Sequence, residues 1–369
     1  MARPVRQRLR RLFPPIAWRD EALAARQVEV AEHRRQIGEL RERVRELQQE
    51  RVAKRGPSFW TQLELLRAEA AYTPNVDTAR LTPLAQVPFK LRNYMLAQSH
   101  GVAVPAILDV ADTGEDLDLA EATGRFVVKG DGGAGGRGVL LLERSGSGAL
   151  IEIGTGRPFR DEEVGPEVAA RSGVRPPYFV ERFIETGDEE ASVPVDVKFF
   201  SFYGQVGHVL LRRVLPGPEG TIVQYRYVDP RGSDLGAVMP AQRVTPDIPL
   251  PADFEEMVRI SRHLSRAVGL PFCRVDLYTG PNGPLLGEIT RAPGGRRIYR
   301  DDHDEQLGRL WVKARARLAL DLARGRPFGA LHGDHPIEDL YPTRSAEAPE
   351  FFPGAWPIVT APCENWCAL

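Results

Sequence analysis

Residues 126–142 constrain the fold of this chain more than any other stretch, because two apolar runs flank a loop that contains six glycines. Apolar runs of this length bounded by glycine are typical of buried strands, so a hairpin is predicted, with Lys129 at the end of its first strand. Gly133–Gly138 match the letters G-x-G-x-x-G, but that dinucleotide fingerprint must open a helix, and a strand pattern follows here. The Walker pattern is also excluded, because no Lys-Ser or Lys-Thr follows the glycines.

Two interpretations of this hairpin remain. Glycines allow backbone N–H groups to approach phosphate oxygens and allow the loop to move, and Lys129 supplies a compact cation. The alternative is a mobile glycine turn beside a surface lysine. Lysine is rare in this chain, with only five among 49 basic residues, so a retained lysine favours a specific role.

Length, charge and cysteine content limit the class of protein. The 369 residues allow two or three domains, and the net charge of −1 excludes a globally basic nucleic-acid-binding protein. Three cysteines are too few for a disulfide framework and favour a reducing compartment, and Cys363 and Cys367 lack two further ligands for a metal. Because there is no secretory leader pattern and no 18-residue apolar run, a cytoplasmic location is expected.

The first 55 residues differ in charge from the remainder, with 15 basic and 8 acidic residues. Residues 1–19 are expected to be a disordered basic terminus, and contact with an anionic membrane surface or with an acidic partner is the alternative. Residues 20–55 form a predicted helix with a heptad seam in which His33 is a defect. Four positions of the seam are spaced by sevens: Leu23, Val30, Ile37 and Val44. A coiled coil that forms a homodimer and a helix that packs on its own domain both remain open.

The rest of the chain alternates between helix and strand patterns. Helices are expected at 59–71, 88–100, near 161–171, at 252–269 and at 304–324. Further strands are expected at 102–108, 178–184, 193–203, 205–214, 272–278 and 285–290, and the tail from 326 is expected to be irregular. In the strand at 193–203, Asp196 and Lys198 share a face, which in most strands is a solvated one.

Two acidic residues are predicted on neighbouring strands. Asp276 and Glu288 lie on the two sides of the turn at Pro281–Gly283, each inside an apolar strand. Two carboxylates brought together in this way are unfavourable unless a cation neutralises them. Carboxylate and phosphate oxygens are the usual ligands of Mg²⁺, so a metal site is favoured over a salt bridge.

Taken in order, these parts resemble the ATP-grasp superfamily, and within it the TupA-like group, which is associated with teichuronopeptide-type cell-surface polymer synthesis. The resemblance covers roughly residues 80–325. The residues that carry it are Phe126–Lys129, Glu181, Asp196–Phe200 with Gly204, Tyr227–Asp229, Arg274–Tyr278, Gly287–Thr290, Pro293–Gly295 and Asp304–Gly308. It implies an α+β fold in which two lobes clamp ATP, preceded by a helical extension.

On this resemblance the chain divides into six segments. They are a basic N-terminus (1–19), a helical extension (20–75), an α/β subdomain (76–125), a first lobe with the glycine-rich lid (126–186), a second lobe with the metal site (187–325) and a proline-rich tail (326–369).

The resemblance also implies roles for individual residues. ATP would be bound by Lys90, Lys129, the lid glycines Gly133, Gly135, Gly136 and Gly138, the hinge residues Glu181, Phe183 and Ile184, and Asp188 or Glu189 at the ribose. Two Mg²⁺ ions would be held by Asp276 and Glu288, and Thr290 stands where many relatives have an asparagine ligand. The catalytic cations would be Lys198, Arg213 and Arg274, and a substrate carboxylate would meet Arg274 or the pair Arg296–Arg297.

The implied reaction is the ATP-dependent joining of a carboxylate to an amine through an acyl-phosphate, on small or polymer-linked substrates of a cell-surface polymer or natural product. One alternative is a phosphotransferase that acts on a hydroxyl, for which His208 and His303 are the available bases. The other is a catalytically inactive coiled-coil adaptor. The retained Lys129, Lys198, Asp276 and Glu288 argue against an inactive protein.

Overall fold

The computed structural model describes residues 14–54, 56–73, 79–133, 136, 138–185, 193–217, 220–295, 298–341 and 353–368. The chain divides into two units, Met1–Gly56 and Pro57–Leu369, which are described separately. The predicted site residues that lie outside the described residues are Gly135, Asp188, Glu189, Arg296 and Arg297. Residues 1–13 of the basic terminus lie outside them as well. In the part that is described, no helix is long and apolar enough to cross a membrane.

The first unit contains one long helix, α2 (Pro14–Lys54), which begins six residues before the predicted start. Ion pairs between neighbouring turns support it, for example Arg35 with Glu32 at 2.7 Å and with Glu39 at 3.2 Å. Its described side chains, Trp18, Arg19 and Glu21–Glu46, are all exposed. The predicted N-terminal helix is therefore confirmed, and the described side chains of its apolar seam are exposed.

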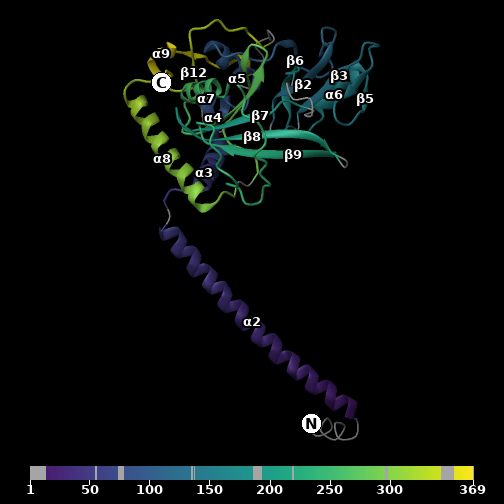
Figure 1. Cartoon of the computed structure of the whole chain (residues 1–369), viewed down its shortest axis with the longest axis vertical. Helices are drawn as coiled ribbons and strands as arrows, with labels where there is room; N and C mark the ends of the chain where they lie inside the picture. The colour runs from purple at the N-terminus through teal and green to yellow at the C-terminus, as the bar shows by residue number, and fades with distance from the viewer. Residues whose placement is uncertain are drawn as a thin grey trace. The chain divides into compact units, whose positions relative to one another are not determined.

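The second unit is an α+β fold with two antiparallel sheets (Figure 1). The first sheet has the strand order β1 (Ile107–Ala111), β6 (Arg175–Arg182), β2 (Gly124–Gly132), β3 (Val139–Arg144), β4 (Leu150–Glu152), β5 (Pro158–Phe159). The second has the order β11 (Gly283–Thr290), β10 (Cys273–Gly280), β7 (Asp196–Ser201), β8 (Val206–Gly217), β9 (Gly220–Val228). A short parallel pair joins β12 (Leu331–His332) to β13 (Val359–Thr360). The predicted hairpin at 126–142 is confirmed as β2 and β3.

Helices cover these sheets. They are α3 (Phe59–Tyr72), α4 (Pro83–Gln86), α5 (Lys90–Ser99), α6 (Asp161–Ala169), α7 (Phe254–Val268), α8 (Asp301–Ala323) and α9 (Cys363–Trp366), with 3₁₀ turns at Ala79–Leu81 and Pro353–Ala355. Their ends follow the sequence: Ser58 accepts a hydrogen bond from Thr61 N at the start of α3, and Gly269 ends α7 in the left-handed conformation.

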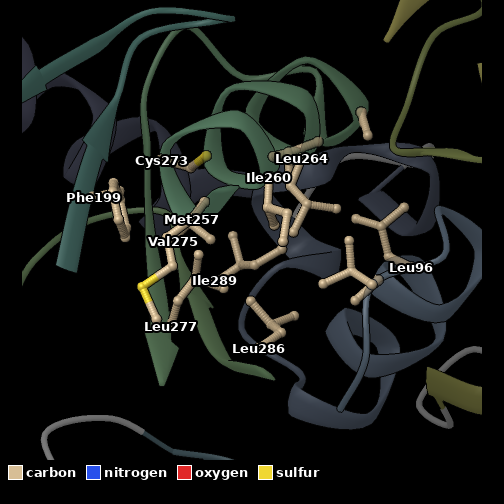
Figure 2. Close-up of a cluster of buried hydrophobic side chains, with 14 of the residues drawn as sticks. Leu96, Phe199, Met257, Ile260, Leu264, Cys273, Val275, Leu277, Leu286 and Ile289 are labelled. Atoms are coloured by element: carbon tan, nitrogen blue, oxygen red, sulfur yellow. The ribbon is translucent and has the colours of Figure 1, made fainter. Parts of the chain in front are cut away.

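One face of the second sheet forms the main core against α7 and α5. Figure 2 shows Met257, Ile260 and Leu264 of α7 beside Val275 and Ile289 of β10 and β11. All five side chains are buried, and each contributes about 1.5–3 kcal/mol by leaving water. Because side chains alternate along a strand, this apolar face turns Asp276 and Glu288 to the other side.

The other face is partly covered by aromatic side chains from α3 and α8, which lie side by side in Figure 1. Phe59 of α3 contacts Trp311 of α8 with ring centroids 5.6 Å apart. Asp304 accepts a hydrogen bond from Trp60 N at 3.0 Å, and a Cβ on Gly308 would lie 1.8 Å from Pro57 O. The segment Asp304–Gly308 therefore serves the packing of these two helices.

Two predictions about elements are wrong. The strand expected at 102–108 begins only at Ile107, and Ala103 makes an isolated bridge with Leu285 instead. The tail from 326 is not simply irregular, because it supplies β12, β13 and α9 and places Leu331 and Cys367 in the main core. The hydrophobic positions of the tail are too widely spaced to show a period.

Candidate active site

A row of charged side chains crosses three strands of the second sheet. Lys198 on β7 lies opposite Asp276 on β10, and Asp276 lies opposite Glu288 on β11. Directly paired residues of antiparallel strands point to the same face, so these three side chains share one surface. Arg274 and Thr290 form the next pair along the same face.

Asp276 is the centre of this row. Its carboxylate accepts hydrogen bonds from Arg274 Nε and Nη2 at 2.6 and 2.7 Å and from Lys198 Nζ at 2.6 Å. Lys198 Nζ also lies 2.5 Å from Asp196 Oδ2. Burial acts to raise the pKa of Asp276, but the two cations outweigh burial and hold the pKa below its usual range. Asp276 is therefore a carboxylate whose charge is compensated inside the fold.

Glu288 is less enclosed than Asp276. Its side chain is 35% exposed, and Arg274 Nη2 lies 3.7 Å from Glu288 Oε2. Thr290 Oγ1 accepts a hydrogen bond from Arg274 Nη2 at 3.2 Å. Arg274 therefore contacts both predicted metal-binding carboxylates and the threonine.

These residues suit a magnesium ion that is shared with phosphate. Among the described residues, no group of three His, Cys, Asp or Glu side chains could hold a metal unaided. Mg²⁺ is commonly bound by one or two carboxylates together with substrate phosphates. Asp196 Oδ1 is moreover a buried oxygen with no hydrogen-bond partner, beside Lys198. The row thus offers carboxylate oxygens to a cation that a ligand brings with it.

A second charged cluster lies at the glycine hairpin. Lys129 on β2 forms an ion pair with Glu181 on β6, and only 3% of the Glu181 side chain is exposed. Tyr94 of α5 donates a hydrogen bond to Glu181 Oε2 at 2.8 Å, and its hydroxyl lies 3.5 Å from Lys129 Nζ. Burial and the Glu181 charge raise the pKa of Tyr94, which stays a neutral donor.

Tyr94 also joins the two sheets. Its hydroxyl lies 3.3 Å from the carbonyl oxygen of Gly287, the residue before Glu288. The hairpin lysine and the charged row are therefore connected through one buried side chain. Tyr94 was not predicted as a site residue, because in the sequence it looks like an ordinary apolar position of the helix expected at 88–100. Only its hydroxyl group could have indicated a polar role.

Lys90 and Asp131 support the base of the glycine loop. Lys90 Nζ donates to the carbonyl oxygens of Gly130 and Asp131 at 2.9 and 3.3 Å, and Lys90 is buried. The Asp131 carboxylate accepts from Leu91 N at the start of α5 and from the Tyr341 hydroxyl, each at 2.8 Å. Lys90 thus holds the loop backbone in this structure. Asp131, inside the predicted glycine loop, is fully buried at the end of β2.

The glycines of the loop have two different roles. A Cβ on Gly130 would lie 2.3 Å from Val174 Cγ1, and one on Gly138 would lie 2.8 Å from Val174 Cγ2. These glycines are needed for close packing, not only for mobility. Gly133 and Gly136 have φ values of +147° and +73°, which favour glycine for the turn itself.

The predicted hinge follows β6. Phe183 is buried, its N–H donates to Arg125 O at 3.3 Å, and the Arg125 guanidinium lies 5.0 Å from its ring centre. Ile184 is half-buried at the end of this segment. Phe183 thus fixes the chain where it leaves the first sheet.

The register favours Arg212 over Arg213 as the cation of this site. Arg212 lies opposite Asp196, two residues from Lys198, so it shares the face of the charged row. Arg213 is the next residue and points to the opposite face. The sequence predicted that only one of the two faces the site and favoured Arg213, whereas the pairing places Arg212 on the face of the charged row.

His208 and His303 lie together in the aromatic cluster. His303 Nε2 is 3.0 Å from His208 Nδ1, and both rings are buried. Burial, with a contribution from Arg300, lowers the pKa of His303 to about 4. This environment suits a structural pair better than a solvent-connected general base.

The second unit thus has two antiparallel sheets, and each sheet carries one of the charged clusters. Residues 80–312 match the family model described as TupA-like ATPgrasp. This match spans more than half of the chain, which therefore belongs to the TupA-like ATP-grasp family.

Related proteins and solved structures are more distant. The chain is 26% identical over 246 residues to a probable alpha-L-glutamate ligase of Xanthomonas oryzae pv. oryzae (strain MAFF 311018), covering 66% of this chain and 67% of the relative. A homologue of the same description from Xanthomonas campestris pv. campestris (strain 8004) is 26% identical over 245 residues, covering 66% and 68%.

Among solved structures, D-alanine–D-alanine ligase from Bacillus anthracis has a TM-score of 0.42 and 16% identity, covering 65% of this chain and 71% of that one. The RimK domain protein ATP-grasp from Sphaerobacter thermophilus DSM 20745 has a TM-score of 0.35 and 14% identity, covering 62% and 67%.

Proposed function

We propose that this protein is an ATP-dependent carboxylate–amine ligase that forms an amide through an acyl-phosphate. The observation that carries the proposal is the arrangement of Lys198, Asp276 and Glu288 on one face, connected through Tyr94 to Lys129 of the glycine hairpin. Cations and carboxylates in alternation suit a ligand that carries both negative phosphates and bound cations. Family membership supports ATP as that ligand.

The nucleotide would occupy the space between these two clusters. Lys129 and the loop backbone would bind the phosphates, because a lysine and free N–H groups compensate their charge. Asp276 and Glu288 would hold Mg²⁺, which when bound would neutralise phosphate charge. We further propose that two ions bind, as the pair of carboxylates permits.

The reaction needs positioned cations and no covalent nucleophile from the protein. A carboxylate oxygen of the acid attacks the γ-phosphorus, and the bond from phosphorus to the oxygen of the leaving ADP breaks. The amine then attacks the acyl carbon, phosphate leaves, and the nitrogen loses a proton. Lys198, Arg212 and Arg274, which share one face of the sheet, would compensate the charge that develops on the transferred group.

The relatives suggest which substrates to test first. Because two of them are named probable alpha-L-glutamate ligases, we propose L-glutamate as the first amine or acid substrate. The TupA-like family supports a polymer-linked acid of the cell surface as the other partner. Arg274 suits such a carboxylate, because a guanidinium fork can bind both oxygens.

A trapping assay tests this proposal. The protein is incubated with Mg·ATP, L-glutamate and a panel of carboxylic acids, with hydroxylamine added as a small amine. ADP, inorganic phosphate and a hydroxamate in equal amounts would support the ligase. ADP with a phosphorylated product and no free phosphate would establish a phosphotransferase instead. If neither turnover nor nucleotide binding is found with any mixture, the protein is an inactive member of the family.

A matched pair of variants tests the metal assignment. Glu288→Gln removes one charge from the row and should lower magnesium-dependent turnover by about 10²-fold or more. Glu255→Gln, on the exposed surface of α7, is the control and should retain turnover. Equal activity of the two variants, measured across a magnesium titration, would exclude Glu288 as a ligand.

A further inference from the structure

Helix α2 carries an apolar seam whose described side chains are exposed within the first unit. The helix has 41 residues and is about 60 Å long at 1.5 Å per residue. The seam residues are between 47% and 66% exposed: Leu23, Val30, Ile37, Leu40 and Val44. Helical stability in proteins comes mostly from packing of an apolar face, so a helix of this kind gains stability from a partner along the seam.

The polar positions of the seam determine which partner orientation fits. In the heptad, Leu23, Val30, Ile37 and Val44 occupy position a, and position d holds Arg26, His33 and Leu40. A parallel, in-register pair would place each d residue opposite the same residue of the second helix. Two copies of Arg26, which carry like charges, would then meet inside the interface, and so would two copies of the polar His33. Both contacts are unfavourable in an apolar seam.

An antiparallel pair avoids these contacts, because each a position faces a d position of the other helix. With the two-fold axis near residue 35, Val30 faces Leu40 of the second copy. Arg26 lies beside Val44 of that copy and His33 beside its Ile37, so polar side chains can extend along aliphatic ones to water. The midpoint of α2 is residue 34, so this register overlaps the helices over almost their whole length.

The flanking charges fit the same register. Glu29 and Arg43 occupy g positions that face each other across an antiparallel pair, twice by symmetry. Each holds an exposed ion pair within its own helix, Glu29 with Arg26 at 2.9 Å and Arg43 with Glu46 at 2.9 Å. Such exposed pairs are worth little and can extend into a four-membered network between helices. Arg34 lies opposite Arg34 of the second chain near the axis, and this is the one repulsive contact within the segment 21–46.

We propose that α2 binds the α2 helix of a second copy of this chain as an antiparallel two-stranded coiled coil centred near residue 35. The seam pattern, the opposed g charges and the coincidence of the axis with the helix midpoint carry this inference. It does not depend on the proposed ligase activity, since no site residue lies in the first unit.

Two valines in one helix provide a matched test of the seam. Val30→Asp puts a carboxylate into the seam, whereas Val28→Asp changes a valine that is 70% exposed and lies outside it. In sedimentation equilibrium of the full chain, the wild type and Val28→Asp should have twice the chain mass of 41.0 kDa. Val30→Asp should raise the dimer dissociation constant by about tenfold or more.

Single cysteines test the orientation. Gln36→Cys lies at a g position close to the axis, so two copies come within disulfide reach only in the antiparallel pair. Leu40→Cys lies at a d position, so two copies meet only in a parallel pair. Mild oxidation should link Gln36→Cys and leave Leu40→Cys unlinked, with the unsubstituted protein as the background for the native cysteines.

Three results would overturn the proposal. A monomeric wild type at all concentrations would mean that the seam packs on its own chain. Equal dimer affinities of Val28→Asp and Val30→Asp would exclude the seam as the interface. Selective linking of Leu40→Cys would replace the antiparallel register with a parallel one.

Discussion

Lys198 and Asp276 lie opposite each other on β7 and β10, with 2.6 Å between Nζ and Oδ2, and Arg274 holds the same carboxylate from its own strand. A buried carboxylate is tolerated there because two cations compensate it. The same three charges would face the phosphates and the substrate carboxylate in the proposed reaction. Structure and proposed chemistry therefore depend on one set of ion pairs, and variants must separate the two effects.

The pair of Lys129 and Glu181 allows that separation. Lys129→Ala leaves a buried carboxylate without its cation, so the free energy of unfolding should fall by about 3 kcal/mol and nucleotide binding should be lost. Lys129→Met combined with Glu181→Gln removes both charges, which should restore stability but not binding. Urea unfolding and calorimetric nucleotide titration measure the two effects, with the exposed Lys313→Ala as control. Normal binding by the double variant would contradict the role of Lys129.

Tyr94 should contribute to both sheets. Tyr94→Phe removes the hydroxyl that donates to Glu181 and leaves the ring in place, so unfolding should become easier by about 1–3 kcal/mol because Glu181 loses a buried partner. Tyr72→Phe, at a residue 74% exposed, is the matched control and should change little. An equal midpoint of chemical unfolding for both variants would show that the Tyr94 hydroxyl does not contribute to the free energy of unfolding.

Arg212 and Arg213 should differ in their effect on turnover. Arg212→Ala removes a cation from the face of the charged row and should lower kcat by about 10²-fold. The decrease in kcat caused by Arg213→Ala should be smaller by about tenfold or more, because this side chain points from the opposite face of β8. Steady-state kinetics of both variants in one substrate mixture decide the matter. The reverse order of effects would show that the β7–β8 register does not define the site.

Asp131 should make stability depend on pH in an unusual direction. Burial raises the pKa of Asp131 to about 6, although Leu91 N and the Tyr341 hydroxyl lower it. The unfolded value is about 3.9, so between these values the folded state binds the extra proton, and stability falls by about 3 kcal/mol in total as pH rises from well below 3.9 to well above 6.

Asp131→Asn removes this titration and keeps an acceptor for Leu91 N. The stability of the variant relative to the wild type should therefore increase from pH 4.5 to pH 7 in urea unfolding. Tyr341→Phe removes a bond that lowers the pKa of Asp131, so it should steepen the fall of stability with pH. A relative stability of Asp131→Asn that is constant with pH would exclude a raised pKa.

Much of the fold follows from local patterns. The pairing of Asp276 with Glu288 could be predicted because a short turn at Pro281–Gly283 sets the register of two adjacent strands. The hairpin with Lys129 was predictable for the same reason. Each depends on residues close in sequence, where periodicity and turn residues are informative.

The contacts that close the candidate site could not be predicted in this way. Tyr94 reaches Glu181 across 87 positions, and Tyr341 reaches Asp131 across 210. Such contacts depend on how the helices and the tail pack on the sheets. The hydrophobic periodicity of a single sequence does not indicate this packing. The choice between Arg212 and Arg213 likewise required the pairing with Asp196.

The ion pairs of the candidate site have a consequence for selectivity. A bare polyanion that drew Lys129 and Lys198 to itself would leave Glu181 and Asp196 in the interior without counter-ions and would leave Asp276 with Arg274 alone. A polyanion that arrives with divalent cations can exchange partners instead, its anions taking the lysines and its cations taking the carboxylates. If the site binds ATP as proposed, it would exchange one set of ion pairs for another and would favour a nucleotide that brings its divalent cations with it.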